Sequence, residues 1–234
     1  MGWLRMTPAE LAALKLSLWV SAWAVAASLP VGIFTAWVLA RTRFPGKPLL
    51  DGLVHLPLVL PPVVIGYLLL VLMGRHGLIG ALLDRYLGVV VAFNWKGAVL
   101  AAAVMAFPLM VRAVRLSLEA VDPGLEAAAR TLGAGPVRVF ITITLPLMTP
   151  GIITGAILAF ARSLGESGAT ITFVSNIPGQ TQTLPLALYA LTQVPEGEAG
   201  AARLCLLSIV IAMAALLVSE GLSRRFTRRL RGQR

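Results

Sequence analysis

The chain has 234 residues, of which 58% are hydrophobic and 13% are charged, and its mean hydropathy is +0.85. This composition is too apolar for a soluble domain of this length and indicates a membrane protein. The net charge of +10 does not indicate nucleic-acid binding, because six of the 20 basic residues lie in the last eleven positions, beside an apolar segment. We interpret this end as a basic cytoplasmic tail. The one cysteine, Cys205, lies in an apolar run and is expected to pack in the core.

Five apolar segments are long enough to cross a membrane, because a helix needs about 20 apolar residues to span the hydrocarbon core. We expect these spans at about residues 16–40, 49–73, 96–118, 139–165 and 203–222. The expected fold class is an all-α membrane protein, with a single transmembrane domain over residues 1–234. The first segment is uncharged for 25 residues, which is longer than the apolar part of a signal peptide, so we interpret it as a retained span.

The second segment is interrupted by Pro61 and Pro62, which leave backbone carbonyls one turn earlier without a hydrogen-bond donor. Inside a membrane, such carbonyls must be covered by protein or face a water-filled cavity. The pattern therefore predicts a kinked helix that lines a cavity, with Gly66 allowing a neighbouring element to approach. A kink that serves packing alone is equally consistent. Asp51 and His55, four residues apart near the start of this segment, favour a local helix-end pair over a ligand or proton site.

Two connections between the spans are expected to contain shorter helices. Residues 74–95 include a sixteen-residue apolar run broken by Asp84 and Arg85, which indicates an interfacial or re-entrant helix rather than a span. Residues 166–202 are rich in Gly, Pro, Thr and Gln, with one short surface helix expected at about residues 184–194. A docking surface for an external partner and a solvated loop are both consistent with this second connection.

The connection between the third and fourth spans is a compact polar block. Asp122 suits the N-cap of a short helix, and Pro123 suits its first turn. Gly133 and Gly135 can adopt the left-handed conformation that ends a helix, and Pro136 can begin the next one. We therefore predict a rigid knob made of a helix, a tight corner and a second helix.

The end of the fourth span is unusually polar. A charge at the centre of a membrane helix costs about 2.5–3.5 kcal/mol, so Arg162 and Glu166 must pair, face water or lie near the membrane surface. Ser163, Ser167 and Thr170 add hydroxyl groups nearby, and these groups with one arginine could pass a small hydrated oxyanion. We assign Glu166 to holding Arg162 or closing a gate. An ion pair that only satisfies a helix end is an equal alternative.

The distribution of basic residues predicts the orientation of the spans. The segments around the inner ends of the first, third and fifth spans hold 13 basic residues, against 7 elsewhere. By the positive-inside rule, that side of the membrane is cytoplasmic. The N-terminus is then expected outside and the C-terminus inside, with the polar block facing the cytoplasm.

The sequence contains no recognisable catalytic constellation. It lacks the GxxxxGK(S/T) motif that cradles nucleotide phosphates, its two histidines lie in different segments, and no metal site is expected. We therefore expect a protein that is not an enzyme and that takes its energy from another subunit.

The polar block resembles the EAA loop of ABC importer permeases, whose pattern is EAA, three residues, Gly, nine residues, Ile, one residue and Leu-Pro. From Gly133 onward the match is complete, through Ile143 to Leu145 and Pro146. Upstream, Glu126-Ala127-Ala128 begins one residue early, so strict spacing places Ala127 where the family has Glu. The resemblance implies a loop at residues 122–146 that docks a separate ATPase, while a salt bridge from the Glu position to that partner stays open. The implied docking residues are Glu126, Ala127, Ala128, Ala129, Arg130, Leu132, Gly133, Pro136, Leu145 and Pro146.

Three longer stretches, at residues 41–70, 103–147 and 160–185, resemble the permease subunit of bacterial molybdate ABC transporters. The likeness extends from about Leu11 to Glu220. In that family the motif after the fourth span reads GEFGA, and here Ser167 replaces the aromatic residue. Sulfate permeases share much of the pattern.

This resemblance implies a type I ABC importer in the bacterial inner membrane. Two copies of the permease would associate with two cytoplasmic ATPase subunits, which bind ATP and Mg, and with an external binding protein. No cofactor in this chain and no nucleic-acid partner is implied. The substrate would be molybdate or tungstate, with sulfate, thiosulfate or phosphate as the runner-up, and a non-transporting membrane scaffold is the alternative from another class. The residues expected to line the path or gate are Pro61, Pro62, Gly66, Arg162, Ser163, Glu166, Ser167 and Thr170.

Overall fold

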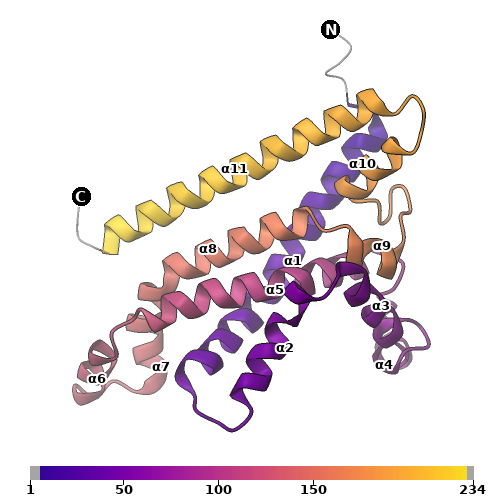
Figure 1. Cartoon of the computed structure of the whole chain (residues 1–234). Coiled ribbons are helices and arrows are strands. Elements are labelled where there is room, and N and C mark those ends of the chain that lie inside the picture. The colour runs from indigo at the N-terminus through magenta and orange to yellow at the C-terminus, as the bar shows by residue number, and fades with distance from the viewer. Residues whose placement is uncertain (1–5, 231–234) are drawn as a thin grey trace.

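The computed structural model describes residues 6–230 and, within this range, consists of helices joined by short connections, with no strand (Figure 1). The four longest helices are α1 (Pro8–Arg41), α5 (Trp95–Glu119), α8 (Leu145–Leu164) and α11 (Glu198–Leu230). Four helical segments of the described chain are long and apolar enough to cross a membrane: α1, α5, the stretch Pro136–Leu164 that ends with α8, and Glu198–Val218 of α11.

The second expected span is broken into two helices. α2 (Lys47–Val59) and α3 (Pro62–Met73) meet at a bend of 115°. The prolines explain the break, because neither Pro61 nor Pro62 has an N–H to donate to the last carbonyls of α2, and both suit the start of a helix. If this bent pair is counted as one span, the described residues contain five candidate spans. The predicted kink is therefore confirmed, although it is a full break rather than a bend within one helix.

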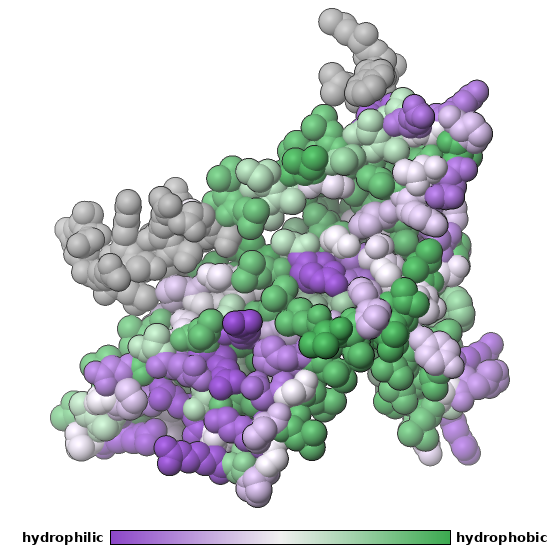
Figure 2. All heavy atoms as spheres, in the orientation of Figure 1, coloured by the Kyte–Doolittle hydropathy of each residue, from purple (hydrophilic) through white to green (hydrophobic). Residues whose placement is uncertain are grey.

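The core lies along α5. Small residues on this helix, Ala98, Ala101, Ala102 and Ala106, are almost fully buried, and they let α1 and α8 pack closely against it. Such small side chains are typical of helix contacts in membranes, where close backbone approach replaces the hydrophobic driving force. Figure 2 shows hydrophobic residues over the sides of the molecule and hydrophilic residues gathered at the end that carries α6 and α7.

The shorter helices agree in part with the sequence predictions. The expected interfacial helix is α4 (Leu78–Leu87), and the expected outer surface helix is α10 (Leu184–Thr192). A third short helix, α9 (Gly168–Val174), was not predicted. Its seven residues follow the polar end of the fourth span, and a helix this short gives little periodic signal.

The last helix differs from its prediction in length and in the environment of Cys205. The expected span at residues 203–222 lies inside the longer helix α11, and the basic tail continues this helix as far as Leu230, while residues 231–234 lie outside the described residues. Cys205 is exposed, so the expectation of core packing is wrong. The reason is that the described part of α11 packs mainly against α8 and α10, which leaves neighbouring apolar residues such as Leu206, Ile209 and Val210 exposed as well.

Candidate functional site

The polar block folds as the predicted knob, built from α6 (Pro123–Thr131), α7 (Pro136–Val139) and the π-helical turn η2 (Phe140–Thr144). Asp122 Oδ1 accepts a hydrogen bond of 2.8 Å from the Gly124 N–H and so caps α6. η2 leads directly into α8, which begins with Leu145 and Pro146. A π-helical turn is rare and is often found at functional sites.

A tight corner separates α6 from α7. Gly133 has φ +83°, and its N–H donates to the Arg130 carbonyl while the Ala134 N–H donates to the Ala129 carbonyl, both at 3.0 Å. This is the Schellman pattern, which satisfies the last carbonyls of a helix and requires a left-handed residue. Gly135 differs from its prediction: with φ −67° and ψ 162° it is extended and serves as the N-cap of α7. Only one residue of this turn needs the left-handed conformation.

The knob presents apolar side chains that nothing in the described chain covers. Leu132 is 89% exposed at the corner, and Leu125, Val137 and Ile141 are also exposed. A nine-residue helix that includes Glu126 and Arg130 is too short and too charged to span a membrane. A cluster of exposed apolar side chains on such a projection indicates a contact with another protein.

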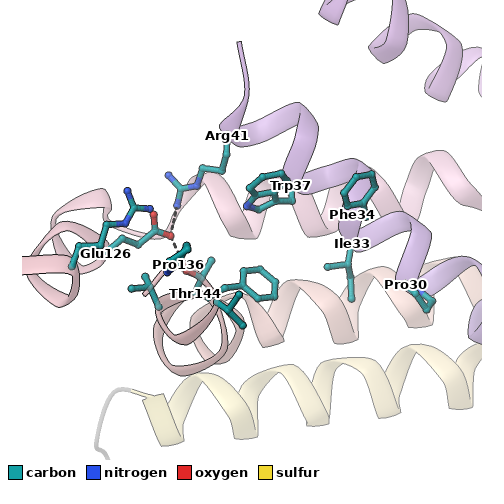
Figure 3. A pocket seen from close by; sticks show the side chains of 12 residues that line it. Pro30, Ile33, Phe34, Trp37, Arg41, Glu126, Pro136 and Thr144 are labelled. Carbon is teal, nitrogen blue, oxygen red and sulfur yellow. Dashed lines mark hydrogen bonds and ion pairs between the residues drawn. The ribbon is translucent and has the colours of Figure 1, made fainter. Parts of the chain in front are cut away.

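Glu126 does not point outward from the knob but ties three segments together (Figure 3). Its Oε1 atom lies 3.1 Å from Arg41 Nη2, at the end of α1, and accepts a hydrogen bond of 2.8 Å from Thr144 Oγ1 in η2. Arg41 Nη2 also donates to the Leu118 carbonyl near the end of α5, at 3.4 Å. We call the set of Arg41, Glu126 and Thr144 the clamp.

The clamp occupies the carboxylate of Glu126, the residue that stands one position early in the EAA pattern. The carboxylate is occupied within its own chain, and its side chain is only 13% exposed, whereas Ala127 is exposed and has no polar group. Arg41 and Thr144 were not predicted as partners of Glu126, because they lie 85 and 18 positions away from it and share no local spacing with it. The clustering of basic residues after the first span was the only signal available for Arg41.

The residues expected at the path or gate come together where α3, α9 and the end of α8 meet. Arg162 Nη1 lies 2.6 Å from Glu166 Oε2, and Glu166 Oε1 accepts a hydrogen bond of 2.8 Å from the Ala169 N–H. Glu166 is almost fully buried, so the pair predicted from the spacing is present and holds the start of α9. Ser163 and Thr170 are buried nearby, and the Ser163 hydroxyl donates to the Ala102 carbonyl at 3.4 Å.

Gly66 lies at a close contact between α3 and α9. A Cβ atom at this position would lie 2.6 Å from the Ala169 carbonyl oxygen and 2.8 Å from Thr172 Cβ. The predicted close approach of a neighbour is therefore confirmed. Pro62 packs against Gly168 of α9 in the same contact, so α9 covers the start of α3.

A separate polar cluster joins α2 to α5. Arg115 pairs with Asp51 at 3.0 Å and with Glu119 at 2.8 Å, and His55 Nδ1 lies 3.4 Å from Asp51 Oδ1. The expected pair of Asp51 and His55 is therefore present, as part of a larger network. Among the residues that the structure describes, no three His, Cys, Asp or Glu side chains gather as a metal site requires.

Comparison with known proteins gives one family and a set of close relatives. Residues 28–232 match the family model described as "binding-protein-dependent transport system inner membrane component". The molybdenum transport system permease protein ModB of Escherichia coli (strain K12) is 67% identical over 219 residues, which cover 94% of this chain and 96% of that protein. The sulfate transport system permease protein CysT of Salmonella typhimurium is 37% identical, over 86% of this chain and 72% of that protein.

The fold is also found in solved structures. A chain of a bacterial alginate ABC transporter, crystallised with a periplasmic protein bound to an alginate pentasaccharide, aligns with a TM-score of 0.74. The alignment covers 95% of this chain and 81% of that chain at 18% sequence identity. At this identity the likeness establishes the fold alone.

Proposed function

This chain belongs to the family of binding-protein-dependent transport system inner membrane components, and from that premise we propose that it is the permease subunit of an ATP-driven importer of molybdate or tungstate. The proposed substrate is inferred from the 67% identity to a molybdenum transport permease over nearly the whole chain. Sulfate is the second candidate, because a sulfate permease is 37% identical over most of the chain.

The knob is the proposed docking site for a separate ATPase subunit. Its support is geometric: a rigid corner at Gly133 holds two short helices, and the apolar side chains of Leu132 and Val137 are exposed on them. In this proposal, ATP binding draws two ATPase subunits together and moves the knob of each permease copy. The clamp passes that movement from α6 to α1, and η2 passes it to α8.

The proposed orientation places the N-terminus outside and the C-terminus in the cytoplasm. It is supported by the 13 basic residues on the side of the knob against 7 elsewhere. We further propose that residues 1–234 form one transmembrane domain, that two copies assemble, and that a binding protein delivers the oxyanion from outside. The nucleotide and its Mg would be held by the ATPase.

The proposed path for the oxyanion passes the junction of α3, α8 and α9. This junction contains Pro61, Pro62, Gly66, Arg162, Ser163, Glu166, Ser167 and Thr170. Arg162 is 28% exposed, and its positive charge is the one group at this junction suited to attract an oxyanion. Glu166 holds the arginine in place from the buried side.

The test is reconstitution of the permease in vesicles with its ATPase and its binding protein. ATP hydrolysis is measured with the binding protein empty or loaded with molybdate, tungstate, sulfate, thiosulfate or phosphate. We expect stimulation by molybdate and tungstate above that by the other anions. Stimulation by sulfate alone would support the second candidate, and hydrolysis that no solute changes would support a membrane scaffold.

A further inference from the structure

A groove runs along the inner half of α1, between this helix and the knob. It encloses about 660 Å³ and is open on one side. Figure 3 shows Pro30, Ile33, Phe34 and Trp37 on the α1 side, with Glu126, Pro136 and Thr144 of the knob at its polar end. The three clamp residues line its polar end, but the proposed transport cycle places no ligand in this space.

The wall of the groove is apolar over the depth of one membrane leaflet. The Phe34 and Trp37 rings stack with centroids 6.4 Å apart, and Phe34 is 64% exposed. Val139 and Phe140 form part of the opposite wall. From Pro30 to Arg41 the helix rises about 16 Å, at 1.5 Å per residue. Half of the hydrocarbon core is about 15 Å thick, so the groove has the depth of an acyl chain in one leaflet.

The other end of the groove is basic. Arg41 and Arg130 both line it, against the one carboxylate of Glu126. Arg130 is exposed and makes no ion pair with any residue whose side chain the structure describes, which are residues 6–218 and 221. Arg41 makes its hydrogen bonds through Nη2, and its buried Nε has no acceptor in the same range. An arginine fork at the membrane surface is a suitable donor for a phosphate.

We propose that the groove binds one anionic phospholipid of the inner leaflet. Its phosphate would lie beside Arg130, and one acyl chain would lie along Trp37, Phe34 and Pro30. The apolar depth excludes a small inorganic anion as the natural occupant, since such an anion would gain nothing from these side chains. Because the headgroup would sit next to the clamp, the bound lipid would also hold α6 against α1. The proposal uses the orientation inferred above but not the identity of the transported anion.

The test uses the fluorescence of Trp37 in the full chain in phosphatidylcholine vesicles. A variant with Trp3, Trp19, Trp23 and Trp95 changed to Phe retains Trp37 alone. A small fraction of lipid with brominated acyl chains, which quench nearby tryptophan, is added as phosphatidylglycerol or as phosphatidylcholine. We expect brominated phosphatidylglycerol to quench Trp37 several-fold more strongly, and a large excess of inorganic phosphate not to reverse this. A variant that retains Trp19 alone, near the other end of α1, should show no such preference.

Two arginines of the knob provide a matched pair. Arg130 lines the groove, whereas Arg138 is exposed on α7 and lines a separate hollow. Arg130→Gln should remove most of the preference for phosphatidylglycerol, and Arg138→Gln should leave it nearly unchanged, with circular dichroism confirming the helix content of both. Equal quenching by the two lipids would show ordinary boundary lipid and overturn the proposal. If neither brominated lipid quenches Trp37, the proposal is overturned in favour of a second copy of the chain in the groove. If excess inorganic phosphate reverses the stronger quenching by phosphatidylglycerol, it is overturned in favour of a site for a simple anion.

Discussion

Glu126 and Arg41 lie 85 residues apart in the chain, and their side chains meet at 3.1 Å between the end of α1 and the knob. Both side chains are largely buried, with 13% and 23% of their surfaces exposed. The ion pair therefore differs from a solvated surface pair, which contributes little. It joins the knob to α1, the first membrane helix.

Glu126→Gln should weaken the clamp and loosen the connection between the knob and α1. Loss of a hydrogen bond to a charged group costs about 1.5–3 kcal/mol, so the thermal midpoint of the permease should fall by several degrees. In the reconstituted importer, less oxyanion should enter per ATP hydrolysed. Glu119→Gln is the matched control, since this carboxylate also pairs with an arginine but is 44% exposed, and its loss should change neither quantity appreciably. Equal effects of the two substitutions would contradict a role for the clamp.

Gly133→Ala should disturb the corner of the knob because the residue has φ +83°. A left-handed backbone with a Cβ atom costs about 1–2 kcal/mol. We expect uptake to become uncoupled from ATP hydrolysis, and a bulkier residue to have a larger effect. Gly135→Ala is the control two residues away: this glycine has φ −67°, and neither position has atoms within 4 Å of an added Cβ, so only the backbone conformation differs. Unchanged coupling in the Gly133 variant would argue strongly against the docking proposal.

Gly66→Ala should separate α3 from α9. The added Cβ would lie 2.6 Å from the backbone carbonyl of Ala169, which cannot move without shifting α9. Overpacking of this kind costs about 1–3 kcal/mol, and we expect both a lower thermal midpoint and slower uptake. Gly52→Ala on α2 meets no atom within 4 Å and should be neutral or slightly stabilising. A Gly66 variant that transports normally would show that the contact between α3 and α9 is not part of the gate.

Helices whose positions depend on hydropathy and capping were predicted from the sequence. Features that depend on contacts between distant segments were not. The apolar runs located the spans, and Pro61 and Pro62 located the break, because both signals are local. The angle of 115° between α2 and α3, and the identity of α9 as the element that packs at Gly66, were not predicted, because neither follows from a local pattern. Cys205 was misplaced because an apolar run does not show which of its faces meets protein.

In the candidate site, too, features set by local spacing were predicted and features that join distant segments were not. The corner at Gly133 and the pair of Arg162 and Glu166 follow from spacing along one segment, and both are present. The partners of Glu126 come from α1 and η2, so the clamp emerged only from the folded chain. The groove beside it also joins residues from distant segments, and its lining could not be assembled from sequence alone.

Arg162 and Glu166 allow a last prediction that separates structure from transport. Arg162→Gln leaves the buried Glu166 carboxylate without its cation, and breaking a buried pair in this way costs about 3–5 kcal/mol. The double variant Arg162→Gln with Glu166→Gln removes both charges, so we expect its thermal midpoint to recover most of that loss.

Uptake by this double variant shows whether the arginine does more than satisfy its partner. If Arg162 contacts the passing oxyanion, the double variant should fold and reach the membrane but remain defective in molybdate uptake. The pair of Arg203 and Glu10 is a suitable control, because it has a similar distance of 2.7 Å and similar burial but joins the N-terminal ends of α11 and α1. Its double glutamine variant should fold and transport. Restored uptake in the Arg162 and Glu166 double variant would mean that the pair only holds α9, and the path of the anion would then have to lie elsewhere.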